Sequence, residues 1–150
     1  MASHPMRSTG TKTPGSQKGD FAAKLRVAQL RPTKQRVALA RLLFAGPDRP
    51  VTAERLHSEA TNSGVQLSLA TVYNSLHQFT AAGLLRQVIV DGEKKYFDTN
   101  TGEHHHFYFE GSDLLTDIPG DDVRIEGLPR APAGTEIERV EIVVRLKPRA

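Results

Sequence analysis

The stretch SLATVYNSLHQFTAAGL, residues 68–84, decides the fold. Ser68 is a residue type that caps a helix N-terminus, and Gly83 suits the left-handed position at which a helix ends. Between them, large apolar side chains recur at helical spacing: Leu69, Val72, Leu76 and Phe79. This spacing predicts a helix with one buried stripe.

The side of this helix away from the stripe is uncharged. Four short polar side chains fall at positions i, i+3, i+4 and i+7: Thr71, Asn74, Ser75 and Gln78. An ordinary solvated face carries Lys and Glu, whereas donors and acceptors of this kind suit base edges in a DNA major groove. We therefore expect these four residues to contact DNA.

A basic hairpin is predicted after the helix. Residues 84–90 suit a strand, Asp91 and Gly92 form a turn signal, and Lys94 and Lys95 begin a second strand. A helix followed by a basic hairpin predicts a winged helix-turn-helix. We expect both lysines of the wing to neutralise DNA phosphates.

Three more helices are predicted upstream, over residues 20–30, 33–44 and 53–62, and Thr33 and Thr52 are suitable N-caps. The second helix exposes basic side chains that we expect to meet phosphates: Lys34, Arg36 and Arg41. The short link after residue 62 joins the third helix to the fourth and completes the helix-turn-helix.

Charge is distributed unevenly along the chain, which has a net charge of +3 over 150 residues. Residues 1–50 hold ten Lys or Arg against Asp20 and Asp48, whereas residues 101–150 hold six basic and ten acidic residues. A basic front and an acidic back point to a polyanion on one side only. Residues 1–19 have few large apolar side chains and are predicted to form a disordered basic tail.

The composition excludes several classes of protein. No apolar run approaches the roughly 20 residues that span a membrane, and the N-terminus lacks the apolar core of a signal peptide. The absence of Cys excludes disulfides and a structural zinc site held by thiolates. A cytoplasmic protein without membrane contact is the resulting expectation.

The character of the chain changes after Asp98, and we place a boundary there between a DNA-binding domain, residues 20–98, and a second domain, residues 99–150. Strands are predicted at residues 104–109, 114–118, 123–125 and 138–146. The fold class is α+β: an N-terminal winged helix-turn-helix, then a small α/β dimerisation domain with a mainly antiparallel sheet. So small a sheet predicts a homodimer.

The most distinctive chemistry lies in the run His104-His105-His106. Strand residues alternate faces, so His104 and His106 share a face about 7 Å apart at Cα while His105 points away. Two imidazoles at that spacing can chelate one ion, with Asp98 or Asp117 completing the shell. They cannot flank one haem from both sides, although a single histidine of the cluster could be a proximal haem ligand.

Several of these motifs together resemble the ferric uptake regulator family over about residues 24–118. They are Pro32-Thr33 with Arg36, Thr52-Ala53-Glu54 with Leu56, Leu69-Ala70-Thr71-Val72-Tyr73-Asn74 with Leu76, Gly83-Leu84, and the histidine run. The unbroken histidines and the lack of cysteine resemble its iron response regulator (Irr) branch. The resemblance implies a dimeric winged-helix transcription factor whose second domain senses metal and dimerises, or haem in that branch.

The resemblance also implies roles for single residues. Tyr73 falls on a DNA-contacting tyrosine, and Arg36 on a basic position of the second helix. The resemblance places the following residues on metal-ligand positions: His104, His106, Asp98 and Asp117, with His105 where the family usually has an acidic ligand.

Other positions depart from the family pattern. Pro50 and Glu103 stand where the family has histidines, and no histidine follows His106. Phe109 and Ser112 replace the cysteines of the structural zinc site. We therefore expect no such zinc site in this chain.

The predicted function is that of a transcriptional regulator of iron- or haem-responsive genes. It binds a double-stranded DNA operator in a sequence-specific way, with haem or a divalent ion (Fe, Mn or Zn) as effector. Whether it represses or activates its targets is left open. The alternatives are a metal-independent winged-helix regulator and a small metal-dependent hydrolase. Because no H-E-x-x-H motif, phosphate loop or Ser-His-Asp set is present, we expect no enzyme.

Overall fold

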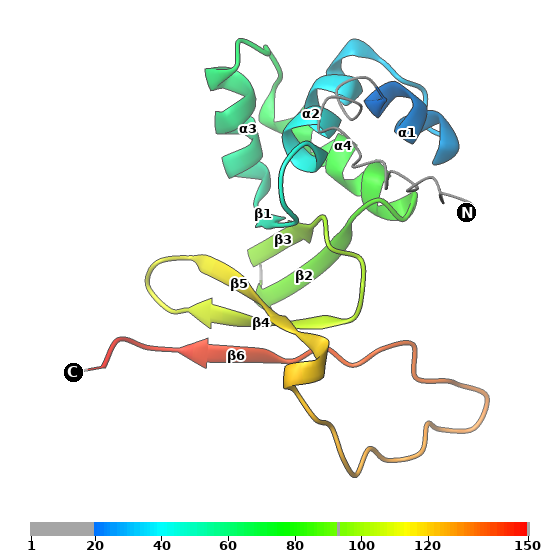
Figure 1. Ribbon diagram of the computed structural model, residues 1–150, viewed down its shortest axis with the longest axis vertical. Coiled ribbons are helices and arrows are strands. Elements are labelled where there is room, and N and C mark those ends of the chain that lie inside the picture. Colours follow the sequence, from blue (N-terminus) through cyan, green and yellow to red (C-terminus); the bar gives the residue numbers. More distant parts are fainter. Residues whose placement is uncertain (1–19, 93, 150) are drawn as a thin grey trace, which may run out of the picture.

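The computed structural model describes residues 20–92 and 94–149. The predicted disordered tail, residues 1–19, lies outside the described residues. Figure 1 shows the helices gathered at one end, a first small sheet beneath them and a second sheet beyond it.

Four helices precede the first hairpin, and they are α1 (Phe21–Val27), α2 (Lys34–Phe44), α3 (Ala53–Asn62) and α4 (Leu69–Ala81). Hydroxyl groups of Thr33, Thr52 and Ser68 accept hydrogen bonds from backbone N–H groups in the first turns of α2, α3 and α4. These three caps were predicted from the sequence and are confirmed. The first helix ends earlier than the predicted residue 30, because Gln29 takes a left-handed φ of 63°.

The first sheet is the wing, built from β1 (Pro50–Val51), β2 (Arg86–Asp91) and β3 (Lys94–Asp98). Its strands are antiparallel in the order β1-β3-β2, and Gly92 turns the hairpin with a φ of 52°. The helices and this sheet enclose one apolar core that includes Leu25, Leu56, Phe79 and Phe97, each 0% exposed. The predicted winged helix-turn-helix is confirmed.

The second sheet is built from β4 (His104–Phe109), β5 (Leu114–Pro119) and β6 (Val143–Leu146), in the order β5-β4-β6. The strands β4 and β5 are antiparallel, whereas β4 and β6 are parallel, so the sheet is mixed. In the described residues 99–149 the only helical element is a 3-10 turn, η2 (Gly120–Asp122). The described part of the C-terminal half is therefore a sheet without an α-helix.

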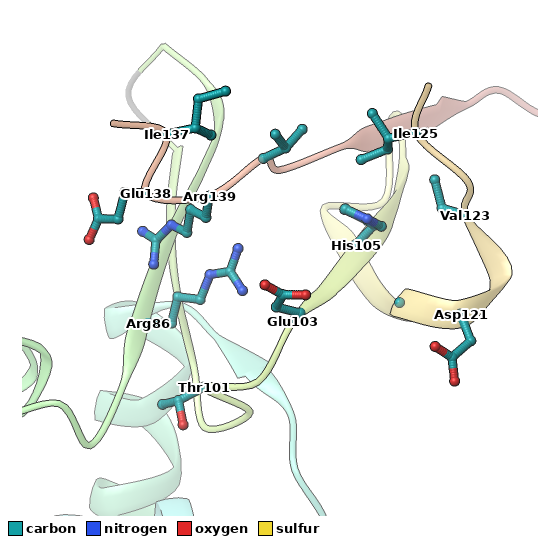
Figure 2. Close-up of a pocket in the computed structure, with 12 residues that line it drawn as sticks. Arg86, Thr101, Glu103, His105, Asp121, Val123, Ile125, Ile137, Glu138 and Arg139 are labelled. Atoms are coloured by element: carbon teal, nitrogen blue, oxygen red, sulfur yellow. The ribbon is translucent and has the colours of Figure 1, made fainter. Parts of the chain in front are cut away.

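Residues 123–142 form a long segment without strand or helix. The strand predicted at 123–125 is absent there, and the strand predicted at 138–146 is confined to its last four residues. Gly127 and Gly134 take positive φ values of 73° and 79°, and Pro129 and Pro132 lack a backbone N–H donor. The segment is therefore suited neither to pairing as a β-strand nor to forming a helix. Together with β2 and β4 it lines a cavity of about 730 Å³ (Figure 2).

The wing and the second sheet pack against each other. Val88, Val90 and Tyr96 of the wing share a small buried cluster with Tyr108 and Leu115 of the second sheet. Because the two sheets share this cluster, the position of the wing depends on the C-terminal half. The division of the chain at residues 98 and 99 stays a prediction. None of the described helices is long and apolar enough to cross a membrane.

Candidate metal centre and nucleic-acid interface

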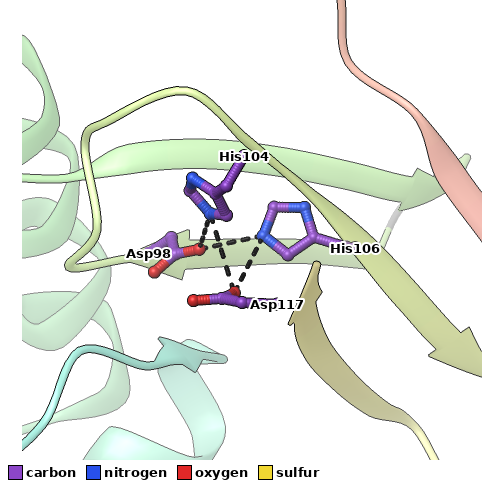
Figure 3. Close-up of side chains that lie close together, drawn as sticks. All are labelled: Asp98, His104, His106 and Asp117. Atoms are coloured by element: carbon purple, nitrogen blue, oxygen red, sulfur yellow. Dashed lines mark hydrogen bonds and ion pairs between the residues drawn. The ribbon is translucent and has the colours of Figure 1, made fainter. Parts of the chain in front are cut away.

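Four potential metal ligands meet where the wing joins the second sheet (Figure 3). Asp98 ends β3, His104 and His106 lie on β4, and Asp117 lies on β5 directly opposite His106 in the antiparallel register. One ligand atom from each side chain lies within 4.8 Å of the others. The spacing of a strand thus brings the two histidines to one face, where the end of β3 and the middle of β5 supply carboxylates.

The contacts within this cluster are short. The Nε2 atoms of His104 and His106 lie 2.7 and 2.9 Å from Asp98 Oδ2. The same two nitrogens lie 3.6 and 3.3 Å from Asp117 Oδ1. The side chains of both histidines are 2% exposed and that of Asp98 is 0% exposed, whereas that of Asp117 is 28% exposed, so three of the four ligands are nearly removed from water.

The hydrogen bond at the far side of the His104 ring settles its tautomer. His104 Nδ1 lies 2.7 Å from the Gly102 carbonyl oxygen, which can only accept, so Nδ1 carries a proton. In the neutral ring, Nε2 then has a lone pair facing the Asp98 carboxylate at 2.7 Å. Two lone pairs at this distance repel each other, so a cation, either a proton or a metal ion, belongs between them.

The pKa values of the two carboxyl groups are shifted in opposite directions. Burial opposes ionisation of Asp98, but hydrogen bonds from His106, the Asn100 backbone N–H and His104 together hold its pKa below the ordinary value. Burial and the nearby charge of Asp98 raise the pKa of Asp117. Asp117 Oδ1 is buried and has no hydrogen-bond partner among the described residues. Two imidazole nitrogens and two carboxylates suit a divalent transition metal, and these residues therefore fit such an ion.

His105 does not join this cluster, and its inclusion among the predicted metal ligands is not supported. Its side chain lies on the opposite face of β4, where Nδ1 accepts a hydrogen bond of 3.1 Å from the Ile142 backbone N–H. The strand alternation that brings His104 and His106 together is the cause. Pro50, which lies opposite Asp98 in the first sheet, has no ligand atom to add.

The recognition face of α4 differs from the predicted set at one residue. Ser75 is only 6% exposed, because it belongs to the buried row Val72, Ser75, Leu76 and Phe79. Its prediction as a DNA contact is therefore wrong, and Leu69, predicted to be buried, is 37% exposed. Asn74 and Gln78 are exposed, whereas Thr71 is half-buried and hydrogen-bonded to the Ser68 hydroxyl.

The side chains of two predicted DNA contacts, Arg36 and Tyr73, form hydrogen bonds with neighbouring residues. Arg36 donates from Nη2 to Gln78 Oε1 at 2.7 Å and from Nη1 to the Arg31 carbonyl at 3.0 Å. Tyr73 donates to Glu54 Oε1 at 2.7 Å, and this hydrogen bond, with burial, raises the pKa of Tyr73. Both side chains are thus oriented before any ligand arrives.

The basic residues fall into two groups. Lys34, Arg41 and Lys95 are exposed, as a phosphate contact requires. Lys94 instead forms an ion pair with Asp113 and donates to the Tyr108 hydroxyl, and these hydrogen bonds raise its pKa. Its side chain is therefore engaged by the second sheet, which the prediction for the wing did not anticipate.

The structure adds one basic residue that the sequence pattern did not single out. Arg55 is exposed in the first turn of α3 and lines a cleft of about 620 Å³ with Tyr73 and Lys95. Only the tertiary structure brings these three residues together, since they belong to α3, α4 and β3.

A winged helix-turn-helix joined to a second sheet by a buried His/Asp cluster defines a class of DNA-binding fold with a candidate metal site. Residues 27–143 match the ferric uptake regulator family, and the chain belongs to this family. The resemblance seen in the sequence is thereby confirmed at the level of the family. Members of the family are transcription regulators and not enzymes.

Two relatives are repressors from staphylococci. The chain is 32% identical over 96 residues to the peroxide-responsive repressor PerR of Staphylococcus aureus strain Mu50, covering 64% of each chain. It is also 32% identical to the repressor of that name from Staphylococcus epidermidis, covering 64% of this chain and 63% of the relative. The matched region therefore spans less than two thirds of either relative.

Solved structures support the same fold. The ferric uptake regulator of Vibrio cholerae superposes with a TM-score of 0.67 at 19% identity, covering 86% of this chain and 100% of that one. The ferric uptake regulator of Pseudomonas aeruginosa, solved with manganese, gives a TM-score of 0.63 at 24% identity, covering 87% and 98%. The α+β architecture with an N-terminal winged helix and a C-terminal sheet is thus shared.

Proposed function

We propose that this protein is a metal-responsive transcription regulator that binds DNA as a homodimer in the cytoplasm. The observation that carries this proposal is the buried cluster of Asp98, His104, His106 and Asp117 at the junction of the wing and the second sheet. Membership in the ferric uptake regulator family supports it, as do the staphylococcal repressors among its relatives.

The position of the cluster suggests how an ion would affect DNA binding. A divalent cation bound here supplies the positive charge that the two buried carboxylates lack. Asp98 belongs to the wing, whereas His104, His106 and Asp117 belong to the second sheet. A bound ion would offset the repulsion between Asp98 and Asp117 and would hold β3 against β4 and β5. The wing and α4 would then keep one orientation toward DNA.

The residues proposed to meet DNA lie on α4 and around it. Asn74 and Gln78 are exposed on α4 and offer amide groups to base edges, with Tyr73 beside them. Phosphate contacts are assigned to the exposed basic side chains of α2, α3 and the wing: Lys34, Arg41, Arg55 and Lys95.

The homodimer is supported by what the C-terminal half leaves uncovered. Its three-stranded sheet ends in the edge strands β5 and β6. Three large aliphatic side chains of the segment between them are exposed: Ile125 at 37%, Leu128 at 51% and Ile137 at 49%. A second copy of the chain would cover such side chains and complete a sheet that is small by itself.

A metal ion is the first candidate for the effector, with Fe, Mn and Zn open, and haem is the second. His105 lines the 730 Å³ cavity, where Val123 and Ile125 lie beside it and charged side chains such as Glu103 and Arg139 also line the wall (Figure 2). The bond from Ile142 N–H to His105 Nδ1, however, leaves the ring proton on Nε2. Haem ligation at Nε2 would have to displace that proton. Assignment to the iron response regulator branch depends on this second candidate.

A titration tests the proposal. Purified protein is titrated with Mn²⁺, Fe²⁺, Zn²⁺ and haem, and binding to labelled operator DNA is followed by fluorescence anisotropy. We expect a divalent ion to change DNA affinity in the wild type and in His105→Ala, and the response to vanish in His104→Ala and His106→Ala. His105→Ala is the matched control because it alters the same strand on its other face.

Two results would contradict the proposal. DNA binding that ignores every ion and haem would favour the metal-independent winged-helix regulator. A response to haem alone, lost in His105→Ala, would move the sensor to the cavity and support the iron response regulator assignment.

A further inference from the structure

Arg86 is a buried cation that the metal site and the DNA interface leave unexplained. It opens β2 at the base of the wing, opposite Asp98 in the β2–β3 register, and is 6% exposed. A guanidinium in such a position normally has all its donors matched by acceptors. The identity of those acceptors shows what the residue does.

Arg86 bonds in two directions. Its Nε and Nη2 lie 2.8 and 2.6 Å from Glu141 Oε1, on the segment that leads to β6. Its Nη1 donates to the Gly102 carbonyl at 3.0 Å. In Figure 2 the side chain extends from β2 into the space below Arg139, beside Glu103.

The Gly102 carbonyl is the atom that also holds His104. It accepts the Nδ1–H of His104 at 2.7 Å, while the Gly102 N–H donates to Asn100 Oδ1 at 3.0 Å. One carbonyl has two lone pairs, and here Arg86 and His104 each take one. The position of this carbonyl decides where the His104 ring points.

We propose that Arg86 is a positioning residue of the metal site: with Glu141 as its anchor, it fixes the Gly102 carbonyl that orients His104 Nε2 toward Asp98 and Asp117. The inference rests on the proposed function of that cluster as a metal site. Hydrogen bonds to the far nitrogen of a ligating histidine set both its tautomer and its orientation. Arg86 does not contact His104 itself but donates to the carbonyl that His104 also uses. It thereby links the site to β2 and to the segment before β6.

The structure offers a matched control for this link. Arg139 also pairs with Glu141 Oε1, at 3.5 Å, and lines the same cavity. Among the described residues, Arg139 forms no hydrogen bond or ion pair with Gly102 or His104. Arg139→Ala removes an arginine from the same carboxylate and leaves the link to His104 in place.

The test measures Mn²⁺ affinity of the full-length protein by competition with a chelator. Arg86→Ala is expected to weaken Mn²⁺ binding about 10- to 100-fold, the usual range for an outer hydrogen-bond partner. Arg86→Lys should weaken it too, because an ammonium lacks the fork that reaches Glu141 and Gly102 together. Arg139→Ala should bind as the wild type does. Added methylguanidinium should restore part of the affinity of Arg86→Ala.

A spectroscopic measurement separates positioning from a general loss of structure. In histidine ring ¹⁵N spectra, the metal-free wild type should show His104 protonated at Nδ1, whereas Arg86→Ala should show a mixture of tautomers. If Arg86→Ala does not fold, Glu141→Ala tests the link from its other end, with weaker Mn²⁺ binding and the same spectral change expected.

The outcomes distinguish this inference from the proposed function. If the wild type binds Mn²⁺ but Arg86→Ala or Glu141→Ala binds it as tightly as Arg139→Ala, with an unchanged His104 spectrum, the inference is wrong and the metal site stands. If the wild type binds no Mn²⁺, or His104→Ala binds it equally well, the proposed function fails first.

Discussion

The two halves of this molecule bury different kinds of side chain. In residues 20–98, four helices and the wing enclose aliphatic and aromatic residues such as Leu56, Phe79 and Phe97, all 0% exposed. In residues 99–149 the buried side chains include His104, His105 and His106 beside a few apolar residues such as Leu115, while other aliphatic residues such as Ile137 face solvent. The first half is stabilised by its own apolar burial. Under the proposed function, the second half would gain stability from a bound cation and from a second copy of the chain.

The largest expected effect lies in the first half. Phe79→Ala removes a fully buried ring from α4 and should lower the free energy of unfolding by about 3–5 kcal/mol. Ile137→Ala should leave that free energy nearly unchanged but weaken self-association, because its side chain is 49% exposed. Urea unfolding and sedimentation measure the two effects. Equal destabilisation by both substitutions would show that the segment before β6 belongs to the core of the monomer.

A smaller effect is expected from replacing Asp117. The substitution should stabilise the metal-free protein and remove the stabilisation that metal gives. The pKa of Asp117 in the folded protein is raised above the ordinary 3.8. Protonated Asp117 therefore adds stability to the folded state below pH 3.8, and this stability is lost as pH rises through the raised pKa. Asp117→Asn removes that loss and should raise the melting temperature of the metal-free protein at neutral pH. The same substitution should abolish metal stabilisation, which at a hundredfold excess over Kd is about 2.7 kcal/mol.

Asp98 provides the contrast for that experiment. Its pKa is lowered, so its contribution to stability is present above pH 3.8 and lost as pH falls through the lowered value. Asp98→Asn should therefore destabilise the metal-free protein at neutral pH while also removing metal binding. If both asparagine variants shift the metal-free melting temperature in the same direction, the two carboxylates do not have the opposite roles inferred here.

The smallest effect concerns the two lysines of the wing. Lys95→Ala should flatten the dependence of log DNA affinity on log salt by about 0.9, the value of one phosphate contact. Lys94→Ala should leave that slope unchanged, because Lys94 is paired with Asp113 in the turn between β4 and β5. Anisotropy titrations at several salt concentrations measure both slopes. A flatter slope for Lys94→Ala would mean that the pair with Asp113 opens on DNA.

Much of the first half was predictable because its signals are local. Thr33, Thr52 and Ser68 cap helices whose own first turns supply the donors, so three helix starts follow from short stretches of sequence. The prediction failed within α4, where the row that includes Ser75 and the row that includes Leu69 are both compatible with helical spacing. The position of the neighbouring helices selects the row that is buried, and no local pattern contains that information.

In the second half, prediction stopped where pairing becomes long-range. The strand signals at residues 123–125 and 138–142 were misleading, because the structure has no strand there. They did not indicate that β6 is short and runs parallel to β4. A register between strands that are so far apart in sequence depends on the whole fold.

The sequence alone determined which histidines share a face of β4. Because strand residues alternate, His104 and His106 lie on one face and His105 lies on the other. It also determined that no thiolate takes part in any site, since the chain contains no cysteine. Only the tertiary structure decided which distant residues complete these groups: Gln78 for Arg36, Asp113 for Lys94, and Glu141 with Gly102 for Arg86. The physical reason is that periodicity is a property of neighbouring residues, whereas the partner of a charged side chain is set by how separate elements pack.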